Sequence, residues 1–135
     1  MPQRVYIDSN VFIYLIDGDN DMRRRALTIL QDFDQQNASL HTSHLTIVEC
    51  TIAPIRDQRT EIVAAFHALL EQSEIVELVA ITRETVGQAA ITAAHLRLKL
   101  PDAIHVATAE ALQCDVFLTN DRGIRAPATI EIRHL

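Results

Sequence analysis

Two acidic residues in this sequence each follow a short apolar run that is typical of a buried strand. Asp8 comes directly after Val5–Ile7, and Asp121 comes shortly after Val116–Leu118. In open α/β sheets, ligands bind outside the carboxyl ends of parallel strands, so both carboxylates should lie at one edge of the sheet. Carboxylates gathered in this way are suited to binding a hard divalent cation such as Mg²⁺.

Two further acids extend this candidate cluster. Asp102 stands in the first turn of a predicted helix, and Glu49 interrupts the apolar segment Thr46–Cys50. A charge buried without a partner is costly, so Glu49 needs either an arginine or a metal ion beside it. Asp8 also has a simpler interpretation as a helix cap. With four acids of this kind, a shared metal site is the interpretation that we favour.

A divalent cation held by these carboxylates is suited to hydrolysing a phosphate ester. Mg²⁺ or Mn²⁺ can activate water and stabilise the negative charge that develops on a phosphate. The predicted site has no set of cysteine and histidine ligands, which disfavours zinc. His105 follows Asp102 by one turn on the same helix face, where it is either a supporting residue behind a ligand or an ordinary structural histidine.

The elements that must position these acids alternate between strands and helices. Five β-type runs predict strands at residues 4–7, 39–42, 75–79, 116–119 and 129–132. Apolar spacing and proline positions predict helices at 22–33, from about 45 to a stop near Pro54, at 61–71, 83–99 and 101–112. The alternation predicts a single α/β domain over residues 1–135, in which helices cover a mostly parallel sheet.

The composition is typical of one globular domain. The chain has 135 residues, of which 48% are hydrophobic and 22% are charged, and this size suffices for a single core. The longest apolar run, Val11–Ile16, is much shorter than the roughly 20 residues of a membrane-spanning helix, and no cleavable targeting segment opens the chain. We therefore expect a cytoplasmic protein without a membrane partner.

The net charge of −6 has the wrong sign for binding nucleic acid by overall electrostatic attraction. Two divalent cations bound by the acids would reduce it to −2, and the metals themselves would attract phosphate. Local positive charge exists, although solvent-exposed helix faces are the better explanation for most of it. The residues concerned are Arg23, Arg24, Arg25, Arg56, Arg59, Arg97, Lys99, Arg122 and Arg125.

One motif imitates a calcium-binding loop. Acids at the first, third and fifth positions of Asp17–Asp21 fit such a loop, but Met22 stands where glycine is needed and Thr28 where glutamate is needed. We interpret the segment as a polar loop that caps the next helix.

The two cysteines, Cys50 and Cys114, lie far apart and have no paired metal-binding spacing. We expect them to be buried free thiols. A cysteine nucleophile activated by His44 or His105 is a formal alternative that we do not favour.

Four segments together resemble the PIN-domain ribonucleases, in particular the VapC-type toxins. The segments are Asp8-Ser9-Asn10, Thr46 with Glu49, Leu100-Pro101-Asp102-Ala103-Ile104-His105 and Thr119-Asn120-Asp121. The resemblance spans nearly the whole chain. It implies a PIN-like α/β domain with a parallel sheet of about five strands flanked by helices on both faces. It also implies Mg²⁺- or Mn²⁺-dependent endoribonuclease activity on RNA.

The resemblance assigns catalytic and metal-binding roles to Asp8, Glu49, Asp102 and Asp121. Our hypothesis is that the three aspartates hold the principal metal and that Glu49 contributes directly or through water. Supporting roles are expected for Asn10, Thr119, Asn120 and His105. Because toxins of this family pair with antitoxins and form homodimers, we expect the toxin of a type II toxin–antitoxin system, with a cognate antitoxin and a homodimeric state.

Two rival functions remain. A metal-dependent phosphatase of similar topology would use a carboxylate nucleophile with a second aspartate beside it, but Asn10 stands at that position. A non-catalytic module that binds RNA or protein is the other rival, and the presence of all four acids speaks against it.

Overall fold

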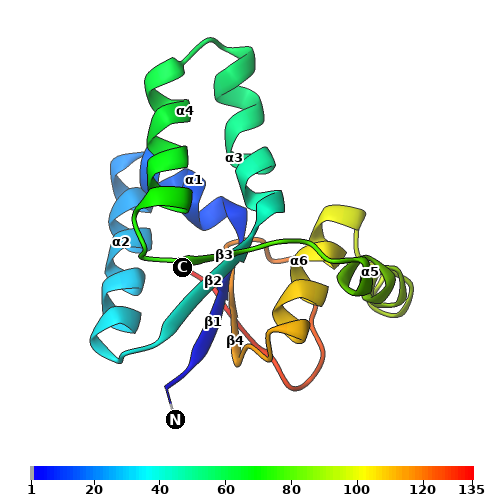
Figure 1. The fold of residues 1–135 in the computed structure, drawn as a ribbon. Coiled ribbons are helices and arrows are strands. Elements are labelled where there is room, and N and C mark those ends of the chain that lie inside the picture. Colours follow the sequence, from blue (N-terminus) through cyan, green and yellow to red (C-terminus); the bar gives the residue numbers. More distant parts are fainter. Residues whose placement is uncertain (1) are drawn as a thin grey trace.

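A five-stranded sheet with β1 at its centre organises the fold (Figure 1). The computed structural model describes residues 2–135. The strands are β1 (Arg4–Ile7), β2 (Ser39–Ser43), β3 (Glu77–Val79), β4 (Val116–Leu118) and β5 (Glu131–Arg133). Their order is β3-β2-β1-β4-β5, and every neighbouring pair is parallel. The carboxyl ends of all five strands therefore lie at one edge, as the sequence predicts.

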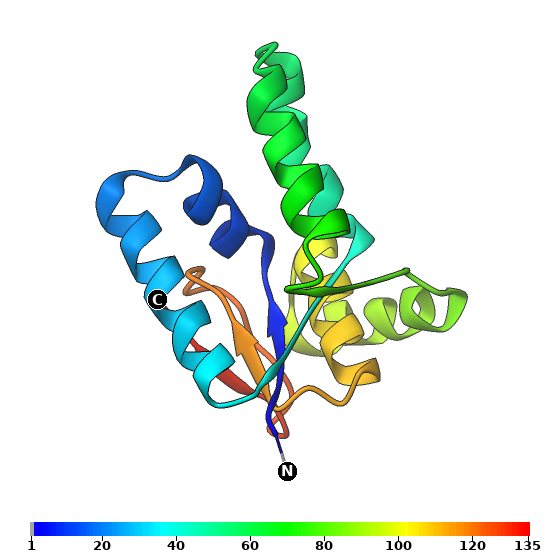
Figure 2. The same cartoon turned by 60° about the vertical axis from the view of Figure 1, so that its left-hand side comes forward.

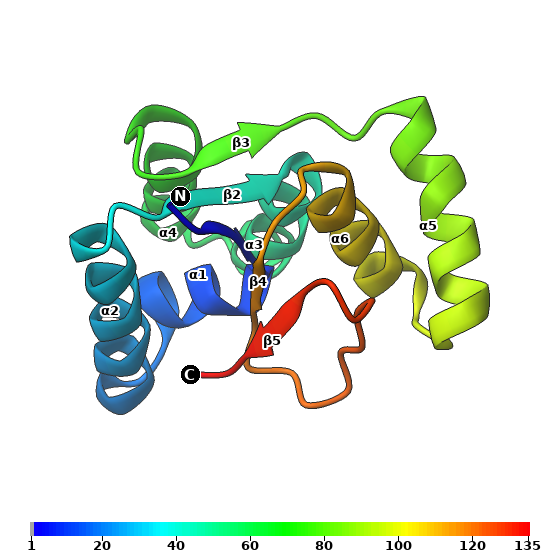
Figure 3. The same ribbon diagram turned by 90° about the horizontal axis from the view of Figure 1, so that it is seen from below.

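Helices cover both faces of this sheet. They are α1 (Ser9–Asp17), α2 (Asn20–Gln35), α3 (His44–Arg56), α4 (Thr60–His67) with the π-helical turn η1 (Ala68–Gln72), α5 (Arg83–Leu96) and α6 (Leu100–Ala111). Figure 3 shows α1 and α2 on one side of the sheet and α5 and α6 on the other. Helices α3 and α4 form a hairpin that projects beyond the sheet (Figure 2). The predicted α/β fold is confirmed.

The central strand is buried on both faces because it separates two hydrophobic cores. Successive side chains of a strand point to opposite faces. Val5 and Ile7 pack in the core under α1 and α2, whereas Tyr6 packs in the core under α6. The ring of Tyr6 stacks on that of Phe117 from β4, with 5.3 Å between the centroids. This arrangement fixes the end of β1, from which Asp8 emerges.

The ends of two helices differ from the prediction. The helix expected to stop near Pro54 continues to Arg56. Pro54 is buried inside the helix, where it removes the one backbone hydrogen bond that its own N–H would donate, and the helix ends two residues later. The helix predicted to run to residue 99 ends at Leu96, because Arg97 adopts a left-handed conformation with φ of 54°.

Two strand predictions also shift slightly. The third strand is shorter than the predicted 75–79, and the fifth begins later than the predicted 129. None of the helices within residues 2–135 has the length and apolar character needed to cross a bilayer.

Candidate active site

Asp8 lies at the centre of the candidate site, at the carboxyl end of β1. Its side chain is buried, and Oδ1 caps α1 by accepting a hydrogen bond of 2.8 Å from the backbone N–H of Ser9. The interpretation of Asp8 as a helix cap is therefore confirmed, and its role in a metal site stays a prediction. Burial raises the pKa of Asp8, although His105 and the hydrogen bond from Thr119 act in the opposite direction. A cation beside this carboxylate would offset the cost of burying its charge.

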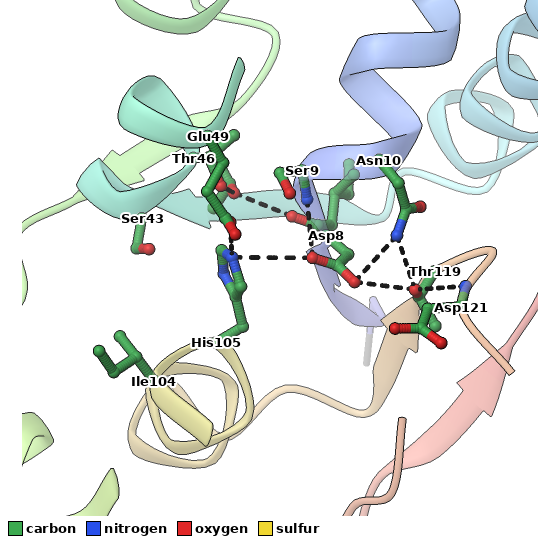
Figure 4. Close-up of polar contacts among 12 residues, drawn as sticks. Asp8, Ser9, Asn10, Ser43, Thr46, Glu49, Ile104, His105, Thr119 and Asp121 are labelled. Carbon is green, nitrogen blue, oxygen red and sulfur yellow. Dashed lines mark hydrogen bonds and ion pairs between the residues drawn. The ribbon is translucent and has the colours of Figure 1, made fainter. Parts of the chain in front are cut away.

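Thr119 and Asn10 hold the second oxygen of Asp8 (Figure 4). Asp8 Oδ2 accepts hydrogen bonds from Thr119 Oγ1 at 2.8 Å and from Asn10 Nδ2 at 3.1 Å. The Thr119 hydroxyl also accepts from the backbone N–H of Asp121 at 3.0 Å. Asn120 takes part through its backbone N–H, which donates to Asn10 Oδ1 at 3.0 Å. This network ties the end of β1 to the turn after β4.

Glu49 reaches the site from α3 and meets His105 from α6. His105 Nε2 lies 2.5 Å from Glu49 Oε1 and 3.7 Å from Asp8 Oδ1. Burial acts to raise the pKa of Glu49, but the hydrogen bond and the charge of His105 outweigh it, so the pKa is lowered. The sequence predicted that the charge of Glu49 needs a partner, and the side chain that meets it is the imidazole of His105 and not an arginine.

A buried tyrosine supports His105 from behind. Tyr6 Oη lies 2.7 Å from His105 Nδ1 and 3.0 Å from Ser43 Oγ. Since both ring nitrogens of His105 have partners, the geometry favours a positioning role for the imidazole. Sequence reasoning missed Tyr6, although a signal was present. Tyr6 and Asp8 are two positions apart in one extended segment, so their side chains point to the same face.

Thr46, one of the residues that carry the resemblance to PIN domains, anchors α3. Its hydroxyl forms no hydrogen bond with the four acids within the described residues. Its hydroxyl lies 2.6 Å from Thr42 Oγ1, which in turn donates to the backbone carbonyl of Ile7 at 2.9 Å. Both threonines are fully buried. They join the first turn of α3 to the ends of β1 and β2, and in this way they help to place Glu49.

Asp102 and Asp121 form the more open part of the site. Asp102 is half-buried in the first turn of α6, and Asp121 is exposed in the turn after β4, where its Oδ1 accepts from the Gly123 N–H at 2.8 Å. Both line one cavity of about 230 Å³. Burial raises the pKa of Asp102, and the negative charges of Asp8, Asp121 and Glu49 raise it further. Asp102 is thus electrostatically coupled to the other three acids.

The structure groups the four predicted acids in two pairs. Asp8 and Glu49 meet at His105, whereas Asp102 and Asp121 line one cavity. One possible ligand atom each from Asp8, Glu49 and His105 lies within 4.8 Å of the others. Within residues 2–135, no lysine or arginine forms an ion pair with any of the four acids. The donors are mainly carboxylate oxygens, and the buried Asp8 carboxylate gains most from a cation. This donor set fits Mg²⁺ or Mn²⁺.

Two subsidiary predictions can also be checked. Cys50 and Cys114 are buried free thiols, as expected, and burial raises the pKa of each to about 12. A thiol with so high a pKa is a poor nucleophile at neutral pH, which argues against cysteine catalysis. Asp19 accepts a hydrogen bond of 2.9 Å from the Met22 N–H and caps α2, as predicted for the polar loop.

Comparison with known proteins identifies one matching family. The PIN domain model matches residues 5–129, which is most of the chain. Among curated proteins, no sequence matches this chain.

Several solved structures share this fold at low sequence identity. A toxin–antitoxin complex from Klebsiella pneumoniae aligns with a TM-score of 0.73 and 20% identity, covering 93% of this chain and 94% of that one. VapBC2 from Rickettsia felis, bound to a DNA fragment from its promoter, has a TM-score of 0.70 and 10% identity, with coverage of 98% and 99%. VapC20 from Mycobacterium tuberculosis, a toxin that cleaves the sarcin–ricin loop, has a TM-score of 0.68 and 15% identity, with coverage of 84% and 86%.

Proposed function

Because the chain belongs to the PIN domain family, we propose that it is a Mg²⁺- or Mn²⁺-dependent endoribonuclease that hydrolyses RNA phosphodiester bonds. One observation carries this proposal. Asp8 and Glu49 lie against His105, and Asp102 and Asp121 line one cavity. No lysine or arginine within residues 2–135 is ion-paired with any of these four acids. Such a cluster is stable at neutral pH when a cation compensates its charge.

The residues divide into those that would hold the cation and those that orient them. Asp8, Asp102 and Asp121 would hold the principal metal, with Glu49 as a further ligand, directly or through water. Thr119 and Asn10 fix the Asp8 carboxylate, and His105 fixes that of Glu49. When bound, Mg²⁺ or Mn²⁺ supplies the positive charge that activates water and stabilises the phosphate undergoing hydrolysis.

The position of Asn10 weakens the phosphatase alternative. Its side-chain NH₂ donates to Asp8 Oδ2 and to Thr119 Oγ1 at 3.0 Å, while its carbonyl oxygen accepts from the Asn120 N–H. The amide is therefore committed to holding Asp8, and an amide cannot act as the general acid that a carboxylate nucleophile would require beside it.

The decisive test is RNA cleavage with and without metal. Labelled single-stranded and hairpin RNAs are incubated with the protein in Mg²⁺, in Mn²⁺ and in excess EDTA. Cleavage is expected only with metal, and Asp8→Asn should reduce it by about 100-fold or more. Asp32→Asn is the matched control, because it makes the same chemical change at an exposed position on α2.

Thermal unfolding gives a second measure that does not depend on finding the right RNA. Mn²⁺ at 100 times its dissociation constant should stabilise the wild-type protein by about 2.7 kcal/mol, and Asp8→Asn should lose most of this effect. Cleavage in EDTA, or full cleavage by a folded Asp8→Asn variant, contradicts the proposal. A metal-induced stabilisation without cleavage of any RNA would favour the non-catalytic alternative.

We further propose that the protein is the toxin of a type II toxin–antitoxin system and acts in the cytoplasm. The similar structures include toxin–antitoxin complexes. A cavity of about 230 Å³ between α1, α2 and η1, lined by Leu15, Leu30 and Leu69, supports the presence of a partner. Leu27 and Ile75 at this cavity are about half exposed, which suits contact with the apolar residues of an antitoxin.

The antitoxin proposal is tested with the product of a neighbouring reading frame. If that frame encodes a short DNA-binding protein, the two chains should purify as a complex, and Leu27→Glu should weaken their association. Independent elution of the two proteins would reject this pairing and leave the nuclease proposal intact.

The proposed homodimer is supported by an apolar stripe on α3. Val48, Ile52 and Ile55 follow helical spacing and are each about half exposed. Light scattering after size-exclusion chromatography should give the mass of a dimer for the wild type and of a monomer for Ile52→Glu. A monomeric wild type at micromolar concentration would contradict the proposal.

A further inference from the structure

Positively charged residues line the same cavity as Asp102 and Asp121. Arg97, Lys99 and Arg125 share this space of about 230 Å³ with the two acids. Within residues 2–135, none of the three cations lies within ion-pair distance of a carboxylate. The cavity therefore holds two carboxylates suited to a metal and three cations whose charge is available to an anion.

Lys99 occupies a position where its charge does not help the fold. It is the N-cap of α6 and makes no side-chain cap hydrogen bond. Serine, threonine, asparagine or aspartate would stabilise this position, and a cation opposes the positive end of the helix dipole. A residue that breaks a local rule in this way often serves function.

Arg125 holds the segment that carries the other two cations. Its Nε donates to the backbone carbonyl of Leu96 and its Nη2 to that of Arg97, both at 2.7 Å. These bonds satisfy carbonyls at the C-terminal end of α5 and fix the left-handed Arg97. They also tie the turn that carries Asp121 to the linker before Asp102. Arg125 is therefore both a cavity cation and a positioning residue.

We propose that Arg97 and Lys99, with Arg125 behind them, bind the RNA phosphate adjacent to the scissile phosphate. The inference rests on the proposed endoribonuclease function and assigns the substrate contacts of the same site. A chain with a net charge of −6 repels RNA at long range. Unpaired cations next to the acids would supply the local attraction that the overall charge lacks.

Steady-state cleavage of an RNA oligonucleotide tests these contacts. Arg97→Gln and Lys99→Gln should each raise KM by about threefold to tenfold, with little change in kcat. The slope of log KM against log salt concentration should fall by about 0.7 for each lost phosphate contact. Arg56→Gln is the matched control, because it removes an equal charge at the last residue of α3, which does not line the cavity.

A modified RNA identifies the phosphate itself. Once the cleavage position is mapped, the adjacent phosphate is replaced by an uncharged methylphosphonate. This change should raise KM for the wild type and have little further effect on Lys99→Gln. Additive effects would show that Lys99 does not contact that phosphate, and they would overturn the assignment.

The outcomes separate this inference from the function on which it rests. If the wild type cleaves RNA but both cavity variants behave like Arg56→Gln, the phosphate site is wrong and the nuclease function stands. If no cleavage is found, the phosphate site can still be tested by RNA binding. Fluorescence anisotropy then compares the Asp8→Asn variant with and without Lys99→Gln. Weaker binding by Lys99→Gln supports the site, and equal binding overturns it. A loss confined to antitoxin binding would assign the cavity to a protein partner and would also overturn it.

Discussion

His105 Nε2 lies 2.5 Å from Glu49 Oε1, although 56 positions separate the two residues in the sequence. The imidazole is almost completely buried, whereas the Glu49 side chain remains 29% exposed. The other ring nitrogen of His105, Nδ1, faces the buried Tyr6 hydroxyl. The orientation of a partly buried acid on α3 therefore depends on a buried pair from α6 and β1.

Replacing His105 should lower RNA cleavage through Glu49. His105→Ala is expected to reduce cleavage by about 10- to 100-fold, and His105→Gln should retain more activity because its amide nitrogen can donate to Glu49. The double variant with Glu49→Gln should be little worse than Glu49→Gln alone. Fully multiplicative effects of the two substitutions would show that they act independently.

Asp102→Asn should make the metal-free protein more stable at neutral pH. Burial and the neighbouring acids raise the pKa of Asp102 in the folded state above its unfolded value. The folded state therefore retains this proton more strongly, and wild-type stability falls as the pH rises from the unfolded pKa through the folded one. The asparagine variant avoids this loss and sacrifices no hydrogen bond of the Asp102 side chain within the described residues.

The measurement is thermal unfolding in EDTA in a series of buffers from about pH 3 to about pH 8, in steps of about one pH unit. Asp102→Asn should unfold at a higher temperature than the wild type at pH 7, and the difference should vanish at the acidic end. Added Mn²⁺ should make the wild type unfold at the higher temperature, since only the wild type keeps all the proposed metal ligands. A variant that is less stable than the wild type at pH 7 in EDTA would refute the predicted repulsion.

Thr119 should prove essential for holding Asp8. Thr119→Val keeps the side-chain volume but removes the hydroxyl that joins Asp8, Asn10 and the Asp121 N–H. We expect a loss of about 1–3 kcal/mol in unfolding free energy and about 10- to 100-fold in Mn²⁺ affinity. Thr119→Ser should preserve most of the unfolding free energy and most of the Mn²⁺ affinity. Calorimetric titration with Mn²⁺ checks the affinity, and equal values for the valine and serine variants would disprove the hydroxyl's role.

Arg125→Lys should separate the charge of this residue from its two hydrogen bonds. Lysine keeps the positive charge, but it lacks the planar group that donates to two carbonyls in fixed geometry. Amide hydrogen exchange at Leu98, whose N–H bonds to the Ala93 carbonyl, should become about threefold to tenfold faster. Unchanged exchange at Leu98 would show that Arg125 does not stabilise the end of α5.

The four acids of the candidate site could be singled out from the sequence because they interrupt strong hydrophobic patterns. Asp8 and Asp121 follow strands that are buried on both faces, and the parallel arrangement places their ends at one edge. Asp102 is marked by the proline before it, and Glu49 by its apolar neighbours. These signals are local, so one sequence is enough to read them.

The supporting contacts could not be predicted because they depend on distances between elements. Tyr6 and His105 meet across 99 positions, and nothing in either local pattern specifies the other. The left-handed turn at Arg97 lacks the glycine that usually marks such a position. Its stability comes partly from Arg125, which is distant in the sequence. Tertiary contacts, in such cases, decide what local propensity leaves open.

The pairing of β1 with β4 joins the first residues of the domain to nearly the last. Asp8 is completed by Thr119, which lies 111 positions later in the chain. During synthesis, β1 emerges early but has only β2 on one side until Val116–Leu118 arrive. A nascent or truncated polypeptide that stops before β4 therefore lacks the Asp8–Thr119 contact and Asp121, and the proposed cation site can form only after the last quarter of the domain has docked.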